Sequence, residues 1–242
     1  MAADLDPSPK PGRDAGASLV TLDGPAGVGK STTARAVARE LGYRYLDSGS
    51  LYRSLTFALL SAGVPEEDWP SLSAEELAGL GLEVRPGGET VEIRLGGRLL
   101  DEELRSETVT RNVSRVAQVA AVRRWLYRAQ RAAAAEGRLV ADGRDMGTVV
   151  FPEARTKVFL TADVRERARR RLGDRGVRLP GDEELLEEAR RLGVRDTQDE
   201  TRAVAPLRVP EGALVLDTTD LTFEAQVDRI VRHARRPREP RG

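Results

Sequence analysis

The segment that most constrains the fold of this chain is a glycine-rich turn between a strand pattern and a helix pattern. Residues 24–31 have the sequence GPAGVGKS; the apolar run Leu19–Asp23 precedes them, and a helical pattern extends from Ser31 to Leu41. Glycines let consecutive backbone N–H groups turn toward an anion, and the helix adds the positive end of its dipole. This G-x-x-x-x-G-K-S spacing predicts a phosphate-binding loop in an α/β fold.

Two side chains carry the chemistry of this loop. Lys30 is expected to reach the β- and γ-phosphates of a nucleotide, and the Ser31 hydroxyl is expected to ligate Mg²⁺. The only lysines are Lys10, Lys30 and Lys157, whereas arginine is abundant, so a compact ammonium in the loop supports this role. Alternatively, Lys30 is one of three lysines that remain by chance, and its presence in the loop carries no meaning. The predicted donor-nucleotide residues of the loop are Gly24, Pro25, Ala26, Gly27, Val28, Gly29, Lys30, Ser31 and Thr32.

The composition excludes several classes of protein. The 242 residues suffice for one α/β domain with insertions, and 39 basic and 39 acidic side chains cancel, which does not favour nucleic-acid binding. The absence of cysteine excludes disulfides and thiolate metal sites. No apolar run approaches the ~20 residues that span a bilayer, and no secretory signal pattern occurs. We therefore expect a cytoplasmic, monomeric protein without membrane partners.

Two residue types that occur once narrow the chemistry further. The only histidine, His233, lies near the C-terminus, so neither a histidine general base nor a multi-histidine metal site is expected. The only asparagine, Asn112, is not followed by lysine. The guanine-reading N-K-x-D motif of GTPases is therefore absent.

Strand and helix patterns alternate along the chain, which predicts a five-stranded parallel sheet covered by helices. A long helix is predicted from about Val109 to Glu136, and the last helix from about Phe223 to Ala234. Tails at 1–17 and 236–242, rich in proline and charge, are expected to be disordered. The predicted strands are Leu19–Asp23, Tyr43–Leu46, Leu139–Ala141, Val158–Thr161 and Leu214–Leu216.

Residues 64–108 interrupt this alternation, so the core is expected to comprise 18–63 and 109–235. Val91, Ile93 and Leu95 alternate with polar residues at the period of a strand. Two Gly-Gly pairs flank this segment and suit two-residue hairpin loops. The pattern predicts a small insert that contains a three-stranded antiparallel meander.

A polar segment, Tyr45–Arg53, follows the second predicted strand, where ligands bind in open α/β sheets. Asp47, Ser48 and Gly49 are expected to form a turn, and Ser50 is expected to cap the next helix. Arg53, one turn into that helix, is well placed to hold a phosphate. A capped turn with an exposed arginine fits these residues equally well.

A second polar segment, Asp142–Asp145, follows Leu139–Ala141. Asp142 is expected to hold Mg²⁺, directly or through water, and Arg144 offers a planar fork to a phosphate. Asp145 can accept a hydrogen bond from a base amino group or a hydroxyl. A surface Arg–Asp pair is the weaker alternative, because two acids and an arginine crowd one strand-end turn.

Arginine also enters an apolar helical stripe that begins at Val109. The next positions on this stripe are Arg123 or Arg124, and then Tyr127. Such an arginine either snorkels to the edge of the helix, which is the commoner case, or meets a ligand in a cleft.

Arg195, Asp199 and Arg202 are spaced i, i+4, i+7, which places them on one helical face. An exposed salt-bridged face has this geometry, and so does a clamp for a phosphate and a sugar. Spacing alone does not choose between them.

Residues 164–200 combine dense arginine with two helices separated by glycines. Asp163 is expected to cap the first helix with Glu166 at the third position, and the second helix begins at about Asp182. This arrangement suggests a lid that closes over ATP and excludes water. A solvated charged face is the usual alternative for such a run.

Together these segments resemble the bacterial cytidylate kinases, of the nucleoside monophosphate kinase group. The resemblance covers almost the whole chain outside the two tails. ADGRDMGTVVFP is the most specific of its motifs. The matching segments are LDGPAGVGKST at Leu22–Thr32, YLDSGSLYR at Tyr45–Arg53, ADGRDMGTVVFP at Ala141–Pro152 and RDTQDETRAVAPL at Arg195–Leu207.

This resemblance implies a P-loop NTPase core with a five-stranded parallel sheet, a small antiparallel insert and a helical lid. It also implies transfer of phosphate from ATP to CMP or dCMP with Mg²⁺. Cytosine recognition falls to Ser48, Arg123 and Asp145. The resemblance also implies contacts with the phosphate and ribose of the acceptor from Arg53, Arg144, Arg195, Asp199 and Arg202. The implied catalytic residues are Lys30, Arg144, Arg195 and Arg202, and Arg167 and Arg170 are the implied lid residues nearest ATP.

The chain departs from the family pattern at a few positions. Ser50 stands where alanine is frequent, and Val28 where a small residue is frequent. The segment Leu192–Val194 replaces charged helical residues, and Gly193 within it is expected to loosen the helix before Arg195.

The sequence alone leaves competing functions open. Another small P-loop kinase, such as an adenylate or shikimate kinase, shares the phosphate loop. A nucleotide-sensing module could retain the fold without turnover, although the intact arginine set argues against it. An RNA-associated P-loop ATPase is disfavoured by the neutral charge balance and by the 4% aromatic content.

Overall fold

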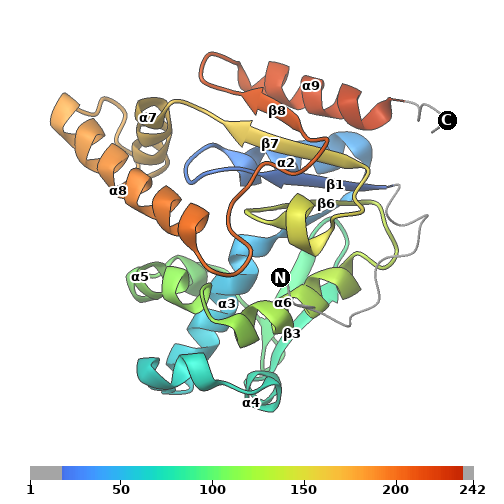
Figure 1. Cartoon of the computed structure of the whole chain (residues 1–242), viewed down its shortest axis with the longest axis vertical. Coiled ribbons are helices and arrows are strands. Elements are labelled where there is room, and N and C mark those ends of the chain that lie inside the picture. Colours follow the sequence, from blue (N-terminus) through green and yellow to red (C-terminus); the bar gives the residue numbers. More distant parts are fainter. Residues whose placement is uncertain (1–17, 237–242) are drawn as a thin grey trace.

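The computed structural model describes residues 18–236, so the predicted tails, apart from Arg236, lie outside the described residues. A five-stranded parallel sheet forms its centre, in the order β2-β6-β1-β7-β8 (Figure 1). All five predicted strands are present, with ends shifted by at most two residues. The strands are β1 (Leu19–Asp23), β2 (Arg44–Asp47), β6 (Leu139–Gly143), β7 (Thr156–Thr161) and β8 (Leu214–Asp217).

Helices cover both faces of the sheet because side chains of each buried strand alternate between two apolar cores. Leu139 and Ala141 of β6 pack in the core beneath α3 (Ser48–Ser61). Val140, between them, packs in the opposite core. That second core lies beneath α2 (Lys30–Leu41) and α9 (Phe223–Arg235).

The predicted antiparallel insert is present as three strands in the order β3-β4-β5 (Figure 1). A backbone hydrogen bond from Tyr45 N to Glu89 O, 2.9 Å, joins it to β2. The elements of the insert are η1 (Glu66–Ser71), α4 (Ala74–Gly79), β3 (Leu82–Pro86), β4 (Val91–Leu95), β5 (Arg98–Leu99) and η2 (Glu102–Arg105).

Two helices, α7 (Val164–Asp174) and α8 (Asp182–Thr201), lie side by side at one end of the molecule (Figure 1). Leu172 of α7 and Leu192 of α8 share a small apolar cluster with Ala26 of the phosphate loop. The expected loosening at Gly193 is wrong, because α8 continues through that residue. Packing on neighbouring positions outweighs the weak helix propensity of one glycine.

The prediction of one helix from Val109 to Glu136 is also wrong. The structure has two helices, α5 (Glu107–Val116) and α6 (Ala120–Ala133), separated by a short turn. The Nη1 of Arg123 donates a hydrogen bond of 2.9 Å to the carbonyl of Ala117 in that turn. The break thus supplies an acceptor to a buried arginine, which an unbroken helix would have used internally.

The cap of α3 also differs from the prediction. Asp47, not Ser50, is the N-cap, because its carboxylate accepts from Ser50 N at 3.0 Å and Ser50 Oγ at 2.7 Å. Ser48 and Gly49 therefore belong to the first turn of the helix and not to a preceding loop. Asp47 lies three residues before Ser50, which is the spacing at which an N-cap side chain accepts from the N3 amide.

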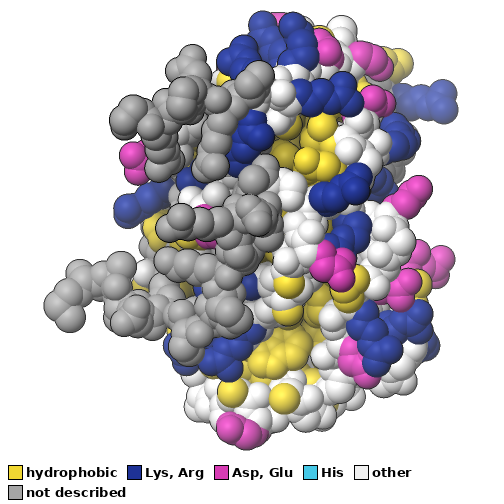
Figure 2. Space-filling view, turned by 90° about the vertical axis from the view of Figure 1, so that its right-hand side faces the viewer, with side chains coloured by type: hydrophobic (Ala, Val, Ile, Leu, Met, Phe, Trp, Pro, Cys, Tyr) yellow, Lys and Arg dark blue, Asp and Glu magenta, His cyan; other side chains and the backbone are white. Residues whose placement is uncertain are grey.

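On the uncovered part of the face in Figure 2, basic and acidic side chains are interspersed. Exposed ion pairs of the described chain include Arg111–Glu107 and Arg191–Glu187. None of the helices between residues 18 and 236 combines the length and apolar character that crossing a bilayer requires.

Candidate active site

The phosphate loop connects the end of β1 to the start of α2, as predicted. Gly24 has a φ of 151°, and a Cβ there would lie 2.3 Å from the carbonyl oxygen of Leu160 in the adjacent strand. Gly29 is the N-cap of α2 with a φ of 86°. Both positions need glycine, the first for close approach and the second for its left-handed backbone. The loop therefore passes from the carboxyl end of β1 to the N-terminus of α2, where helices bind anions.

Lys30 is the first residue of α2 and is largely buried, with 7% of its surface exposed. Its Nζ donates a hydrogen bond of 2.6 Å to the carbonyl of Pro25. Burial, and then the charge of Arg144, lower the pKa of Lys30 well below its usual range. An anion bound in the loop would offset both effects, so this ammonium is suited to a phosphate.

Ser31 and Asp142 meet across the sheet edge. Ser31 Oγ donates to Asp142 Oδ2 at 2.9 Å, and Tyr45 Oη donates to Asp142 Oδ1 at 2.7 Å. Burial, and then the nearby charge of Asp47, raise the pKa of Asp142 to about 7. Within residues 18–236 no cluster of three acidic or histidine side chains could hold a metal alone. The adjacent oxygens of Ser31 and Asp142 suit Mg²⁺, which takes its remaining ligands from phosphates and water.

The loop after β6 forms a second buried polar group. Arg123 of α6 is 1% exposed and forms an ion pair with Asp145, which also accepts from Tyr127 Oη at 2.9 Å. Arg123 is therefore directed inward and does not snorkel, whereas Arg124 is exposed. Ser48 lies against the same loop, since its Oγ would be 2.5 Å from a Cβ at Gly143. The three residues implied for cytosine recognition thus line one region.

Arg144, Arg195, Asp199 and Arg202 come together between β6 and α8. Arg144 Nε donates to Asp199 Oδ2 at 2.7 Å, and Arg202 lies 3.7 Å from both Asp199 and Asp145. Burial, and then the charge of Arg144, lower the pKa of Arg195 to about 10. Among described residues Arg195 forms no ion pair or side-chain hydrogen bond. The excess positive charge favours an anionic ligand.

The spacing of Arg195, Asp199 and Arg202 left two interpretations open, and the structure argues against the exposed face. Arg202 has a 6% exposed side chain, and its Nη2 is buried without a hydrogen-bond partner in the described chain. An exposed salt-bridged face would instead place these groups in water.

Other predicted site residues have partners outside these two clusters. Arg53 donates to Leu104 O at 3.1 Å and Thr110 Oγ1 at 3.0 Å, which holds it against η2 and α5. Arg170 donates to Thr218 at the end of β8 and pairs with Glu166. Thr32 is exposed on the first turn of α2.

Arg167 contacts the phosphate loop directly, and its partner there was not predicted. Its Nη1 donates to Ala26 O at 3.0 Å, and it forms an ion pair with Asp196 of α8. Asp196 Oδ1 accepts from Ala26 N at 3.0 Å. The i, i+4, i+7 spacing of Arg195, Asp199 and Arg202 did not include Asp196, which lies one residue after Arg195.

Tyr45, Tyr127 and Asp196 thus belong to the site although sequence analysis assigned them no role there. Position on the apolar stripe was the only signal for Tyr127. Tyr45 begins the polar segment that follows the second predicted strand, but this position does not identify Asp142 as its partner.

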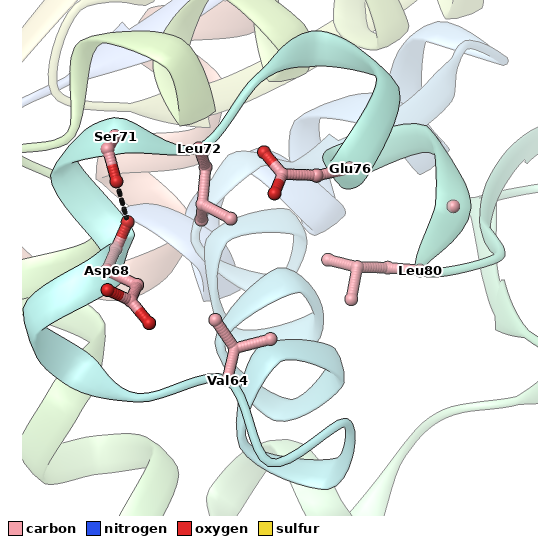
Figure 3. Close-up of a pocket in the computed structure, with 7 residues that line it drawn as sticks. Val64, Asp68, Ser71, Leu72, Glu76 and Leu80 are labelled. Carbon is pink, nitrogen blue, oxygen red and sulfur yellow. Dashed lines mark hydrogen bonds between the residues drawn. The ribbon is translucent and has the colours of Figure 1, made fainter.

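A cavity of about 500 Å³ lies elsewhere, in the predicted insert (Figure 3). Val64, Leu72 and Leu80 face it together with Asp68, Ser71 and Glu76. Glu76 already serves as the capping-box residue of α4 and accepts from Ser73 N at 2.8 Å. None of the predicted site residues lines this cavity, so we place the active site at the sheet edge.

A glycine-rich loop with a buried lysine, facing an arginine-rich pocket across the edge of a five-stranded parallel sheet, defines a P-loop kinase. The family model described as cytidylate kinase matches residues 20–236. The chain is 43% identical to a cytidylate kinase of Salinibacter ruber over 88% of this chain and 95% of the relative. It is 44% identical to that of Pseudomonas aeruginosa over 90% and 95%, respectively. The chain belongs to the cytidylate kinase family.

Proposed function

We propose that this chain transfers the γ-phosphoryl group of ATP to CMP and dCMP, with Mg²⁺, and so forms ADP with CDP or dCDP. The observation that carries the proposal is the buried pair of Arg123 and Asp145 at the acceptor side. Asp145 Oδ2 accepts from Arg123 and Tyr127, whereas Oδ1 accepts no hydrogen bond from the described residues and lies 3.7 Å from Arg202 Nη2. Oδ1 is thus available to the exocyclic amine of cytosine, and an N–H of Arg123 to its carbonyl.

The reaction requires no strong base. The nucleophile is an oxygen of the CMP phosphate, whose second pKa is near ~6, so much of it is dianionic at neutral pH. A new P–O bond forms to the γ-phosphorus while the bond to the β–γ bridging oxygen breaks, and ADP leaves. Catalysis is then positioning and charge neutralisation of a loose, in-line transition state.

The residues of the site divide this work. Lys30 and the loop amides hold the donor phosphates, while Arg144, Arg195 and Arg202 neutralise the acceptor phosphate and the transferred group. Ser31 and Asp142 would hold Mg²⁺, which supplies charge neutralisation at the β- and γ-oxygens. The 164–200 lid, including Arg167 and Arg170, is proposed to exclude water that would otherwise accept the phosphoryl group.

A coupled assay of ADP release across CMP, UMP, AMP, GMP and shikimate tests the proposal. We expect CMP and dCMP to be preferred, because uracil presents a carbonyl where cytosine presents its amine and would face Asp145 acceptor to acceptor. When a site is built to hydrogen-bond its substrate, an analogue that leaves the buried polar groups without partners has a kcat/KM lower by roughly 10⁴-fold. Equal kcat/KM for CMP and UMP would contradict this assignment, and tight CMP binding without turnover would indicate a sensor.

The Mg²⁺ assignment predicts a role for Tyr45. Tyr45→Phe removes one of two hydroxyl donors that orient Asp142, so we expect the Mg²⁺ concentration for half-maximal rate to rise about 10-fold. Tyr43→Phe, two residues earlier in the chain, is the matched control and should leave this concentration unchanged. Identical Mg²⁺ titrations of the two variants would argue against Asp142 as a metal-side residue.

A further inference from the structure

Asp23 is a buried acid that the reaction described above does not use. It is the last residue of β1, immediately before the phosphate loop, and is 0% exposed. Its Oδ1 accepts from Met146 N at 2.8 Å and its Oδ2 from Gly147 N at 2.7 Å. Both carboxylate oxygens are therefore committed to two successive amides of the chain that follows β6.

Those two amides belong to the turn that carries Asp145. β1 and β6 are parallel neighbours with Asp23 opposite Gly143, and Arg144 and Asp145 follow at once. The turn η3 (Met146–Val150) then begins, and the carbonyl of Asp145 accepts from Val149 N and Val150 N. A displacement of this turn would thus displace Asp145 with it.

The contact is also tightly packed. A Cβ at Gly147 would lie 2.8 Å from Thr21 Oγ1 and 3.2 Å from Asp23 Oδ2. The turn can approach β1 this closely only because position 147 is glycine. Hydrogen bonding and steric fit therefore hold the same turn against the end of β1.

The charge of Asp23 is maintained against burial. Burial raises the pKa of Asp23 to about 6, although the amides of Gly147 and Met146 oppose the shift. The charge of Asp145 raises this pKa and that of Lys30 lowers it. A carboxylate is needed here because only it offers acceptors on both oxygens.

We propose that Asp23 is a positioning residue for base selection, which ties the turn carrying Asp145 to the strand that carries the phosphate loop. This role rests on the proposed function, since it requires Asp145 to contact cytosine. Asp23 touches neither substrate; it acts by fixing where Asp145 stands relative to the transferred phosphate. Misplacement by about 1 Å can cost roughly 10²-fold in rate.

Two substitutions test the contact from its two sides. Asp23→Asn presents an amide N–H₂ to a backbone N–H, and Gly147→Ala forces the turn away from Asp23. For both variants we expect KM for CMP to rise roughly 10-fold and the CMP-to-UMP ratio of kcat/KM to fall by about 10- to 100-fold, with KM for ATP within about two-fold. Amide exchange at Met146 and Gly147 should accelerate in Asp23→Asn.

Ile230→Ala is the control for lost stability, because Ile230 is a fully buried residue of α9 in the core on the other side of the sheet. It should lower the melting temperature without changing the CMP-to-UMP ratio. Unchanged selectivity in both folded contact variants, or equal increases in KM for ATP and CMP, would overturn the positioning role. Should Asp23→Asn not fold, Gly147→Ala decides. A wild-type protein that phosphorylates no cytidine nucleotide would instead refute the proposed function, and this role with it.

Discussion

Replacing Lys30 with methionine should reduce kcat by about 10³-fold while the protein stays folded. The methionine side chain preserves the apolar stem but removes the only lysine charge in the phosphate loop. That charge is buried, and no carboxylate lies within ion-pair distance of it in the described chain. Its removal should therefore leave the melting temperature unchanged or higher, because an isolated buried charge does not stabilise the fold.

Steady-state kinetics with CMP and a thermal melt check this result together. Lys157→Met is the matched control, because Lys157 is a half-buried lysine of β7 outside the loop, and its activity should match that of the wild type. Turnover close to the wild-type rate in a folded Lys30→Met protein would contradict the assignment of Lys30 to the donor phosphates.

The second large effect is expected at Arg123. Arg123→Met should reduce kcat/KM for CMP by at least about 10²-fold, because the base carbonyl loses its donor and Asp145 loses its nearest cation. The same change leaves the buried Asp145 with only the Tyr127 hydroxyl and the more distant Arg202, so the free energy of unfolding should fall by about 3–5 kcal/mol. The neighbouring Arg124→Met should change neither quantity, because Arg124 is exposed.

Comparison of the two arginine variants by chemical denaturation and by CMP kinetics separates these effects. If Arg123→Met proves too unstable to assay, Asp145→Asn keeps the size of the side chain and should lower the preference for CMP over UMP. Equal behaviour of Arg123→Met and Arg124→Met would exclude the buried pair from base recognition. Loss of stability with unchanged kcat/KM in the folded fraction would make the pair purely structural.

Much of the fold could be predicted because local sequence patterns indicate its strands, its insert and its phosphate loop. The five core strands and the antiparallel insert follow from runs of apolar residues, from alternation at period two and from glycine pairs. The phosphate loop was predictable from its spacing alone, since few other backbones need glycine at positions such as 24 and 29 and a lysine at 30. These signals lie within a few residues of one another, and tertiary contacts reinforce them.

Two of the failed predictions share a cause, which is that a contact in the folded chain overrides a local pattern. The stripe of α5 and α6 indicated one helix, but Arg123 takes the Ala117 carbonyl and the chain breaks there. At α3, both Asp47 and Ser50 are acceptable caps, and only the backbone geometry selects Asp47. Gly193 weakens a helix in isolation, but α8 remains continuous where it packs on α7.

The sequence by itself determined that a phosphate loop follows the first strand of an α/β sheet and that arginines accompany it, because spacing along the chain controls backbone conformation and helical faces. Only the tertiary structure decided which arginine is buried. It also decided that Tyr45 hydrogen-bonds to Asp142 and that Asp23 accepts hydrogen bonds from the turn that follows Asp145. Such choices depend on groups from different elements, such as Tyr45 and Asp142 or Asp23 and Met146, being brought within hydrogen-bond distance, where burial makes each unpaired charge costly.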